Sequence, residues 1–128
     1  MHLNNILIID DDDATCLILK AILLKNDIVK TFNFCHSGAE ALEFLKQCEK
    51  SQEFPEVVFV DLNMPGMDGF EFIPFYEELF YENQPKTKVA VVTSSMRSRD
   101  KDRSLAFKSV SNFINKPLTN EKILSLAT

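Results

Sequence analysis

Short runs of apolar residues alternate with longer amphipathic segments along the whole chain. Three of the runs are continuous and rich in β-branched residues: Ile6–Ile9, Val57–Val60 and Val89–Val92. Such runs are typical of strands that are covered on both faces. Two further runs, Ile28–Phe34 and Asn112–Asn115, alternate only in part. The pattern therefore predicts three central strands and two edge strands.

Helical periodicity fills the intervals between these runs. The predicted helices cover Ala14–Lys25, a segment that begins at Ser37, Phe70–Tyr81, Arg99–Lys108 and a segment from Thr119 through Ala127. Ser37, with Glu40 three residues later, has the capping-box pattern. Asp12 and Asp13 are both candidate caps of the first helix, and Asp68 is the candidate cap of the third. The third helix also carries an apolar stripe that we expect to face the core. The stripe consists of Phe72, Phe75, Tyr76, Leu79 and Phe80.

Strands that alternate with helices predict an α/β fold, with a parallel sheet, right-handed crossovers and helices on both faces. Ligands of such sheets bind outside the carboxyl ends of the strands, where the strand order reverses. The residues that follow each apolar run are therefore the candidates for chemistry. They are Asp10–Asp13 after the first run, Asp61 after the third, Thr93 after the fourth, and Lys116 and Pro117 after the fifth.

Carboxylates that share one crevice repel each other and recruit a cation. Oxygen ligands select Mg²⁺, Ca²⁺ or Mn²⁺, and Mg²⁺ fits best where the protein supplies few ligands and the substrate carries phosphate. An Asp carboxylate can itself be the nucleophile that forms an aspartyl-phosphate. Asp61, with an ammonium at Lys116 and a hydroxyl at Thr93, has the groups that phosphoryl transfer requires.

Composition narrows the class of protein further. The chain has 128 residues, 45% hydrophobic and 26% charged, which fits one globular domain. Its net charge of −5 argues against a nucleic-acid or anionic-membrane surface. The most apolar window, Ala14–Leu24, is too short to span a bilayer. Three cysteines without a CxxC pair indicate free thiols in a reducing compartment, so we expect a cytoplasmic protein.

Four motifs lie in order at the predicted strand ends: IIDDD, VDLNMPGMDG, VVTSS and NKPL. Together they resemble the receiver domain of two-component response regulators, a family that includes chemotaxis and phosphorelay regulators. The resemblance covers the whole chain. It implies a flavodoxin-like, doubly wound (βα)5 fold with strand order 2-1-3-4-5. It also implies that residues 1–128 are a single receiver domain without an effector domain.

The resemblance also assigns roles to the acidic residues. Asp61 corresponds to the phospho-acceptor, and Asp11 to the direct ligand of Mg²⁺, with Mn²⁺ as the alternative cation. Asp10 would act on the metal largely through water, and Asn63 through its backbone carbonyl. Asn63 lies two residues after the acceptor, and Ser95 lies two residues after Thr93. Both would set the lifetime of the phosphoryl group.

Three further roles follow from the same resemblance. Thr93 corresponds to the hydroxyl that moves toward the phosphoryl group, and Lys116 to the ion-pair partner of the acceptor. The Lys116–Pro117 bond is cis in the family. Phe113 corresponds to the aromatic switch, although a permanently buried Phe is the alternative. The sequence departs from the family at Ser109, where Gly is usual, and in a stretch from Thr93 to Lys116 that is one residue longer.

The expected function is therefore signalling. The phosphodonor would be a sensor histidine kinase or a histidine phosphotransfer protein. The output would pass to a protein target through the face of the fourth helix, fifth strand and fifth helix, without nucleic acid or membrane. The domain would not be an enzyme, apart from self-phosphorylation and self-dephosphorylation. One rival is a haloacid-dehalogenase-like phosphatase, because Asp11, Asp13 and Thr15 fit its DxDxT pattern. The other is a non-phosphorylated pseudo-receiver.

Overall fold

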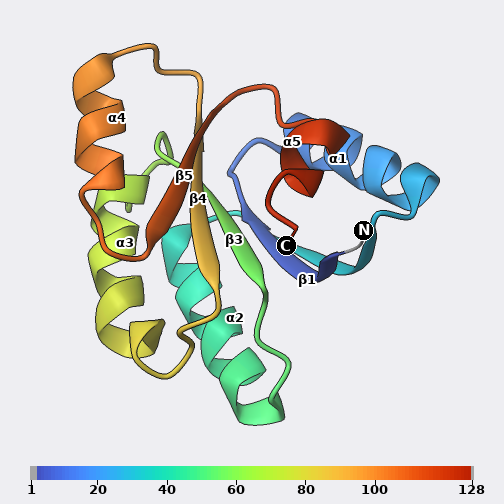
Figure 1. The fold of residues 1–128 in the computed structure, drawn as a ribbon, viewed down its shortest axis with the longest axis horizontal. Coiled ribbons are helices and arrows are strands. Elements are labelled where there is room, and N and C mark those ends of the chain that lie inside the picture. The colour runs from blue at the N-terminus through green and yellow to red at the C-terminus, as the bar shows by residue number, and fades with distance from the viewer. Residues whose placement is uncertain (1–2, 128) are drawn as a thin grey trace.

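A computed structural model describes residues 3–127 as one parallel sheet between two layers of helices (Figure 1). The strands are β1 (Leu3–Ile9), β2 (Val29–Cys35), β3 (Val57–Asp61), β4 (Lys88–Thr93) and β5 (Val110–Asn115). The helices are α1 (Asp13–Asn26), α2 (Gly38–Ser51), α3 (Gly69–Tyr76) with its π-helical continuation η1 (Glu77–Tyr81), α4 (Ser98–Leu105) and α5 (Asn120–Leu124). All pairings are parallel, in the order β2-β1-β3-β4-β5, which confirms the predicted fold and its two edge strands.

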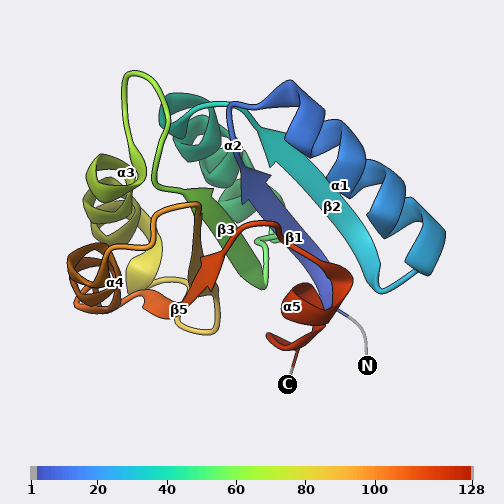
Figure 2. The ribbon, with the colours of Figure 1, turned by 90° about the horizontal axis from the view of Figure 1, so that it is seen from above.

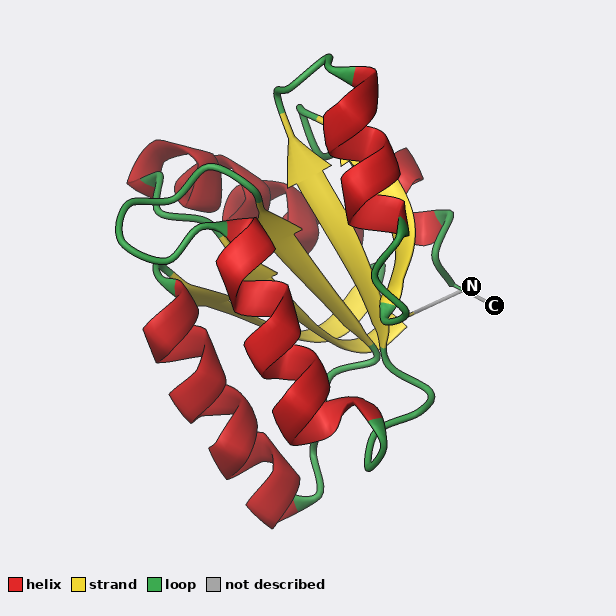
Figure 3. Cartoon of the chain, turned by 90° about the vertical axis from the view of Figure 1, so that its left-hand side faces the viewer, coloured by secondary structure: helices red, strands yellow, loops and turns green. Residues whose placement is uncertain are grey.

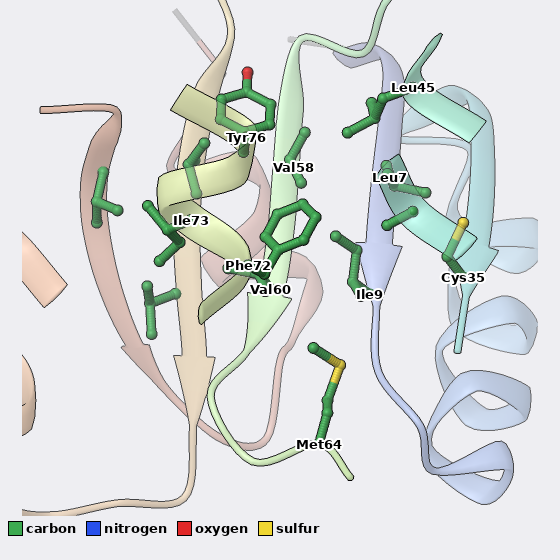
Figure 4. Packing of buried hydrophobic residues seen from close by; sticks show 14 of the residues in the cluster. Leu7, Ile9, Cys35, Leu45, Val58, Val60, Met64, Phe72, Ile73 and Tyr76 are labelled. Carbon is green, nitrogen blue, oxygen red and sulfur yellow. The ribbon is translucent and has the colours of Figure 1, made fainter. Parts of the chain in front are cut away.

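The helices bury both faces of the three central strands, which explains why these strands are apolar without alternation. Helices α1 and α5 lie on one side of the sheet, and α2 and α3 on the other (Figures 2 and 3). The larger core cluster joins one face of the sheet to α2 and α3, with Phe72, Ile73 and Tyr76 from α3 packed on Val58 and Val60 (Figure 4). A second cluster joins the opposite face to α1 and α5. None of the described helices is both long and apolar enough to cross a membrane.

Side-chain caps set most of the helix starts as expected. Asp12 is the N-cap of α1 and accepts a hydrogen bond from the Ala14 amide, and Ser37 caps α2. Asp68 forms a reciprocal capping box with Glu71 at the start of α3. The prediction that Asp13 also caps was wrong. Asp13 is the first helical residue, and its carboxylate lies 3.2 Å from the imidazole of His36.

The third predicted helix differs from expectation in two ways. It changes from α to π geometry at Glu77, three residues after Pro74, whose missing amide removes one helical hydrogen bond. Its apolar stripe is also only partly buried: Phe72, Tyr76 and Phe80 lie in the core, whereas Phe75 and Leu79 are 48% and 39% exposed. The stripe is wider than the face that the sheet can cover.

The last two helices are shorter than predicted. Helix α4 ends at Leu105, and the chain then turns into β5. Helix α5 ends at Leu124 rather than at Ala127. Its continuation is a tighter turn, because the amides of Leu126 and Ala127 donate to carbonyls three residues back, at Ile123 and Leu124.

Candidate functional site

The carboxyl ends of β1, β3 and β5 bring two acidic side chains and one lysine together. Asp10 follows β1, Asp61 ends β3, and both are only 4% exposed. Lys116, just after β5, places its Nζ 3.0 Å from Oδ2 of Asp10 and 3.1 Å from Oδ2 of Asp61. Residues separated by 106 and 55 positions therefore share one ammonium group, as the parallel sheet predicts.

Backbone amides fix the other oxygen of each carboxylate. Oδ1 of Asp10 accepts from the amide of Asp12 at 2.9 Å, and Oδ1 of Asp61 accepts from the amide of Asn63 at 3.0 Å. Each carboxylate thus has one oxygen on the backbone of its own loop and one on Lys116. Each of the two carboxylates is consequently held in one orientation before any ligand arrives.

Gly69 is a positioning residue that the sequence analysis did not single out. It begins α3, and its amide donates to the carbonyl of Leu62. A Cβ at Gly69 would lie 2.8 Å from the backbone oxygen of Asp61 and 2.9 Å from Cα of Leu62, which is closer than atoms can pack. Only glycine lets α3 start this close to the end of β3. The signal was a glycine at a helix start, directly after the Asp68 cap.

The site has more negative charge than Lys116 can neutralise. Oxygens of Asp10, Asp11 and Asp61 all lie within 4.8 Å of one another, so three carboxylates face one ammonium. Burial raises the pKa of Asp61 above its ordinary value, although the Asn63 amide and Lys116 act in the opposite direction. Burial alone would lower the pKa of Lys116, but its hydrogen bonds to Asp10 and Asp61 raise it overall. Lys116 is therefore charged at neutral pH.

The same three carboxylates form the donor set of a hard cation. Carboxylate oxygens are the preferred ligands of Mg²⁺ and Mn²⁺, and two of the three side chains are already fixed by the backbone. Asp11 is exposed and could turn toward an ion without rearranging the core. The residues present therefore fit a divalent cation.

Comparison with known proteins identifies the family. Residues 6–128 match the response regulator receiver domain family. The chain belongs to this family. Receiver domains are signalling modules of two-component systems, and they typically bind a divalent metal ion.

Known receivers support the assignment at the level of both sequence and structure. A two-component response regulator from Cytophaga hutchinsonii is 28% identical, with a TM-score of 0.90 over 98% of this chain and 95% of that chain. A CheY-like receiver domain protein from Methanospirillum hungatei is 25% identical, with a TM-score of 0.75 over 96% of this chain and 89% of that chain. The signal transduction histidine-protein kinase BarA of Escherichia coli is 27% identical over 94% of this chain. The match spans only 12% of the length of BarA.

The rival phosphatase pattern is not assembled in this receiver. Asp11 and Asp13 are both exposed, and the hydroxyl of Thr15 donates to Oδ2 of Asp12, 2.8 Å away. The lysine contacts Asp10 and Asp61 instead of the DxDxT residues. The Lys116–Pro117 bond is cis, as the family resemblance implied.

Thr93 lies beside the receiver's acidic site, but its side chain makes no bond to the ammonium of Lys116. It ends β4 and is fully buried, and its carbonyl accepts from the backbone amide of Lys116 at 2.9 Å. Its Oγ1 accepts from the Ser95 amide at 3.1 Å. Phe113, on the neighbouring strand β5, is half-buried and packs against the larger core cluster.

Ser95 connects the receiver's site to α4 and β5 through hydrogen bonds that the sequence did not indicate. Its hydroxyl donates to Oδ2 of Asp100 in α4 at 2.6 Å, and its carbonyl accepts from the side chain of Asn115 at 2.9 Å. With its amide on Thr93, this one residue touches three elements. Asn115 stands in the NKPL motif, but nothing in the sequence indicated that its amide reaches back across the sheet edge.

Ser109, where glycine is usual in the family, lies just before β5 and bonds η1 through its backbone. The Ser109 amide donates to Oε2 of Glu77 at 2.8 Å, and its carbonyl accepts from Val89. Its buried hydroxyl has no hydrogen-bond partner among the described residues. Both bonds use backbone groups of Ser109, which a glycine would also have, so the departure adds only this hydroxyl, away from the acidic site.

Proposed function

We propose that this receiver accepts a phosphoryl group on Asp61 from a histidine kinase or a histidine phosphotransfer protein, and that it signals by a change of shape. The observation that carries the proposal is the arrangement around Asp61. Its buried carboxylate shares Lys116 with Asp10 and lies within 4.8 Å of the oxygens of two other acids. Histidine kinases among its relatives, such as BarA, contain a matching segment, which supports a donor of that class.

Asp61 would act as the nucleophile. A carboxylate oxygen forms the new bond to phosphorus while the bond from phosphorus to the imidazole nitrogen of the donor breaks, and that nitrogen keeps the electron pair. The backbone amide of Asn63 holds Oδ1 of Asp61, which leaves Oδ2 on the side of Lys116. Lys116 would stabilise the negative charge of the phosphoryl oxygens after transfer, which its bond to Asp61 supports.

Mg²⁺ is the proposed cation, with Mn²⁺ as a substitute. Asp11, Asp61 and the backbone carbonyl of Asn63 would hold it directly, and Asp10 through water. Bound Mg²⁺ would neutralise charge on the phosphoryl oxygens and offset the repulsion between the carboxylates. The excess of two negative charges over Lys116 supports the need for a cation.

Four further residues would turn the modification into a signal. Thr93 would donate its hydroxyl to the phosphoryl group, and Phe113 would respond on β5. Asn63 and Ser95 would tune the lifetime of the phosphoryl group. The face of α4, β5 and α5 would carry the output to a protein target in the cytoplasm, where the three buried thiols stay reduced.

Intact-mass measurement tests the proposal directly. Incubation with acetyl phosphate and Mg²⁺ should add one phosphoryl group that hydroxylamine removes, and EDTA should prevent the addition. Asp61→Asn should abolish labelling, whereas Asp13→Asn, an exposed acid at the start of α1, should leave it unchanged. Labelling that persists in Asp61→Asn would contradict Asp61 as the acceptor. Labelling that persists in EDTA would contradict the metal requirement.

A further inference from the structure

Helix α4 and its two ends carry a concentration of positive charge. Residues 97–108 contain five of the 14 basic residues of the chain and only two of its 19 acidic residues. The five are Arg97, Arg99, Lys101, Arg103 and Lys108. This segment has a net charge of +3 in a chain of net charge −5, so the remainder carries −8. The helix lies at the outer edge of the sheet, beside β5 (Figure 1).

The neighbouring residues do not neutralise these cations. All five side chains are exposed, and none forms a salt bridge with any residue from 3 to 127. Arg103 lies over the ring of Phe70 at 4.0 Å, and Lys108 over the ring of Tyr81 at 4.8 Å, so two of the cations rest on aromatic faces. Asp100, one of the two acids in the segment, is bonded to Ser95.

The arrangement is unfavourable for the helix itself. Arg97 and Lys101 are four residues apart, as are Arg99 and Arg103, and like charges at this spacing repel. Arg97 is the N-cap and makes no side-chain capping bond, and cations at a helix N-terminus oppose the helix dipole. A partner that brings negative charge would relieve both effects.

Apolar side chains flank the charged helix. Met96, just before α4, is 85% exposed, and Leu105, at its end, is 41% exposed. Exposed large apolar residues beside charges of one sign suit a protein partner, whose own apolar side chains can cover them. Nucleic acid would pair with the cations but has no apolar side chains to cover Met96 and Leu105.

We propose that α4 is the docking surface for an acidic protein segment with apolar anchors, and that this segment belongs to the output partner. The second part rests on the proposed signalling function. Its link to the site is Ser95, whose amide donates to Thr93 and whose hydroxyl donates to Asp100 of α4.

The test uses a helical peptide with a Glu-rich stretch and Leu at both ends, together with an analogue in which Gln replaces Glu. Each peptide is titrated into the whole chain by calorimetry. The Glu peptide should bind more tightly than the Gln peptide, and added salt should weaken it. The variant Arg99→Glu/Lys101→Glu should weaken binding by roughly tenfold, as expected for the loss of two exposed ion pairs. Lys46→Glu/Lys50→Glu makes the same charge change on exposed residues of α2 and should have no such effect.

Several outcomes would overturn the docking surface. They are an absence of binding to the Glu peptide, an equal loss in both double variants, or tighter α4-dependent binding to single-stranded RNA or to phosphatidylserine vesicles. Thermal unfolding of each variant by circular dichroism checks that the fold is intact. The mass of the same samples after acetyl phosphate treatment reports on Asp61 separately. Unlabelled protein that still binds the peptide through α4 would overturn the proposed function and leave the surface standing.

Discussion

Replacing Asp61 by Asn should stabilise the fold when no divalent cation is present. Oxygens of Asp10, Asp11 and Asp61 lie within 4.8 Å of one another, and two of these carboxylates, Asp10 and Asp61, bond the ammonium of Lys116. Asn keeps the shape of the side chain and can still accept the hydrogen bond of the Asn63 amide, but it removes one of the three negative charges. The raised pKa of Asp61, which burial causes, agrees that the fold disfavours its charged form.

The distances give the size of the effect. With an effective dielectric constant of roughly 20, the attraction between Asp61 and Lys116 at 3.1 Å is about 5 kcal/mol. Repulsion from each of two carboxylates at no more than 4.8 Å is at least about 3 kcal/mol on the same scale. The repulsions together slightly exceed the attraction, and desolvation adds to them, while water around the exposed Asp11 reduces its share. We therefore expect Asp61→Asn to raise the free energy of unfolding by about 1–2 kcal/mol.

Urea unfolding at neutral pH measures the difference in the free energy of unfolding. The transition is followed by far-ultraviolet circular dichroism, because the chain has no Trp. In EDTA the midpoint of Asp61→Asn should lie above that of the unmodified protein. Saturating Mg²⁺ should stabilise the unmodified protein by up to about 2.7 kcal/mol at a hundred times the dissociation constant, and the variant by less. The control is Asp27→Asn, which removes an exposed charge at a position of left-handed backbone conformation that Asn also adopts. Its free energy of unfolding should stay within about 0.5 kcal/mol of that of the unmodified protein.

Two results would refute this reasoning. If Asp61→Asn is less stable than the unmodified protein in EDTA, the ion pair with Lys116 outweighs the repulsion, and the excess of charge is not a source of instability. If Mg²⁺ stabilises both proteins equally, Asp61 does not contact the cation. The first result concerns only the electrostatic balance of the site, whereas the second also contradicts the proposed metal ligands.

Three further predictions concern other parts of the molecule. Gly69→Ala should lower the free energy of unfolding in urea by about 1–3 kcal/mol, because the new Cβ meets the backbone of Asp61; an unchanged midpoint would contradict the close approach. Burial raises the pKa of Cys35 to about 12 from an ordinary 9.0. The free energy of unfolding should therefore fall as pH rises above 9, where only the unfolded state loses this proton. Cys35→Ala should make that fall of stability with pH less steep. Lys116→Arg should keep some phosphorylation but lose the amide-shift response at Phe113 to beryllofluoride, because a planar guanidinium cannot replace a compact ammonium; a normal response would show that the lysine is dispensable.

The sequence predicted the sheet and the meeting of the site residues for the same physical reason. Central parallel strands are buried on both faces, so their apolar runs are unmistakable, and their carboxyl ends must converge. The meeting of Asp10, Asp61 and Lys116 could therefore be predicted without any knowledge of side-chain geometry. The roles of these residues in phosphoryl transfer, by contrast, came from the family resemblance and remain predictions.

Features that depend on tertiary packing could not be predicted from the sequence. Periodicity assigned Phe75 and Leu79 to the core, but it cannot tell how much of a helix the sheet covers. The change to π geometry after Pro74 depends on how the freed carbonyl is accommodated. Asp13 was a plausible cap by residue type, but a helix has one N-cap, and Asp12 occupies it.

The hydrogen bonds of Thr93 suggest why occupation of the acidic site should reach α4. Its hydroxyl oxygen accepts from the Ser95 amide, and among the described residues its hydroxyl donates to no acceptor. A phosphoryl oxygen on Asp61 would offer that acceptor, but turning toward it would take the hydroxyl away from Ser95. An amide left without a partner in a half-buried loop is costly, at about 1–3 kcal/mol, so Ser95 would have to follow. Since Ser95 also holds Asp100, a movement of this loop would shift the cationic helix relative to β5. A preference of a few kcal/mol between two loop positions is enough to couple the site to the surface.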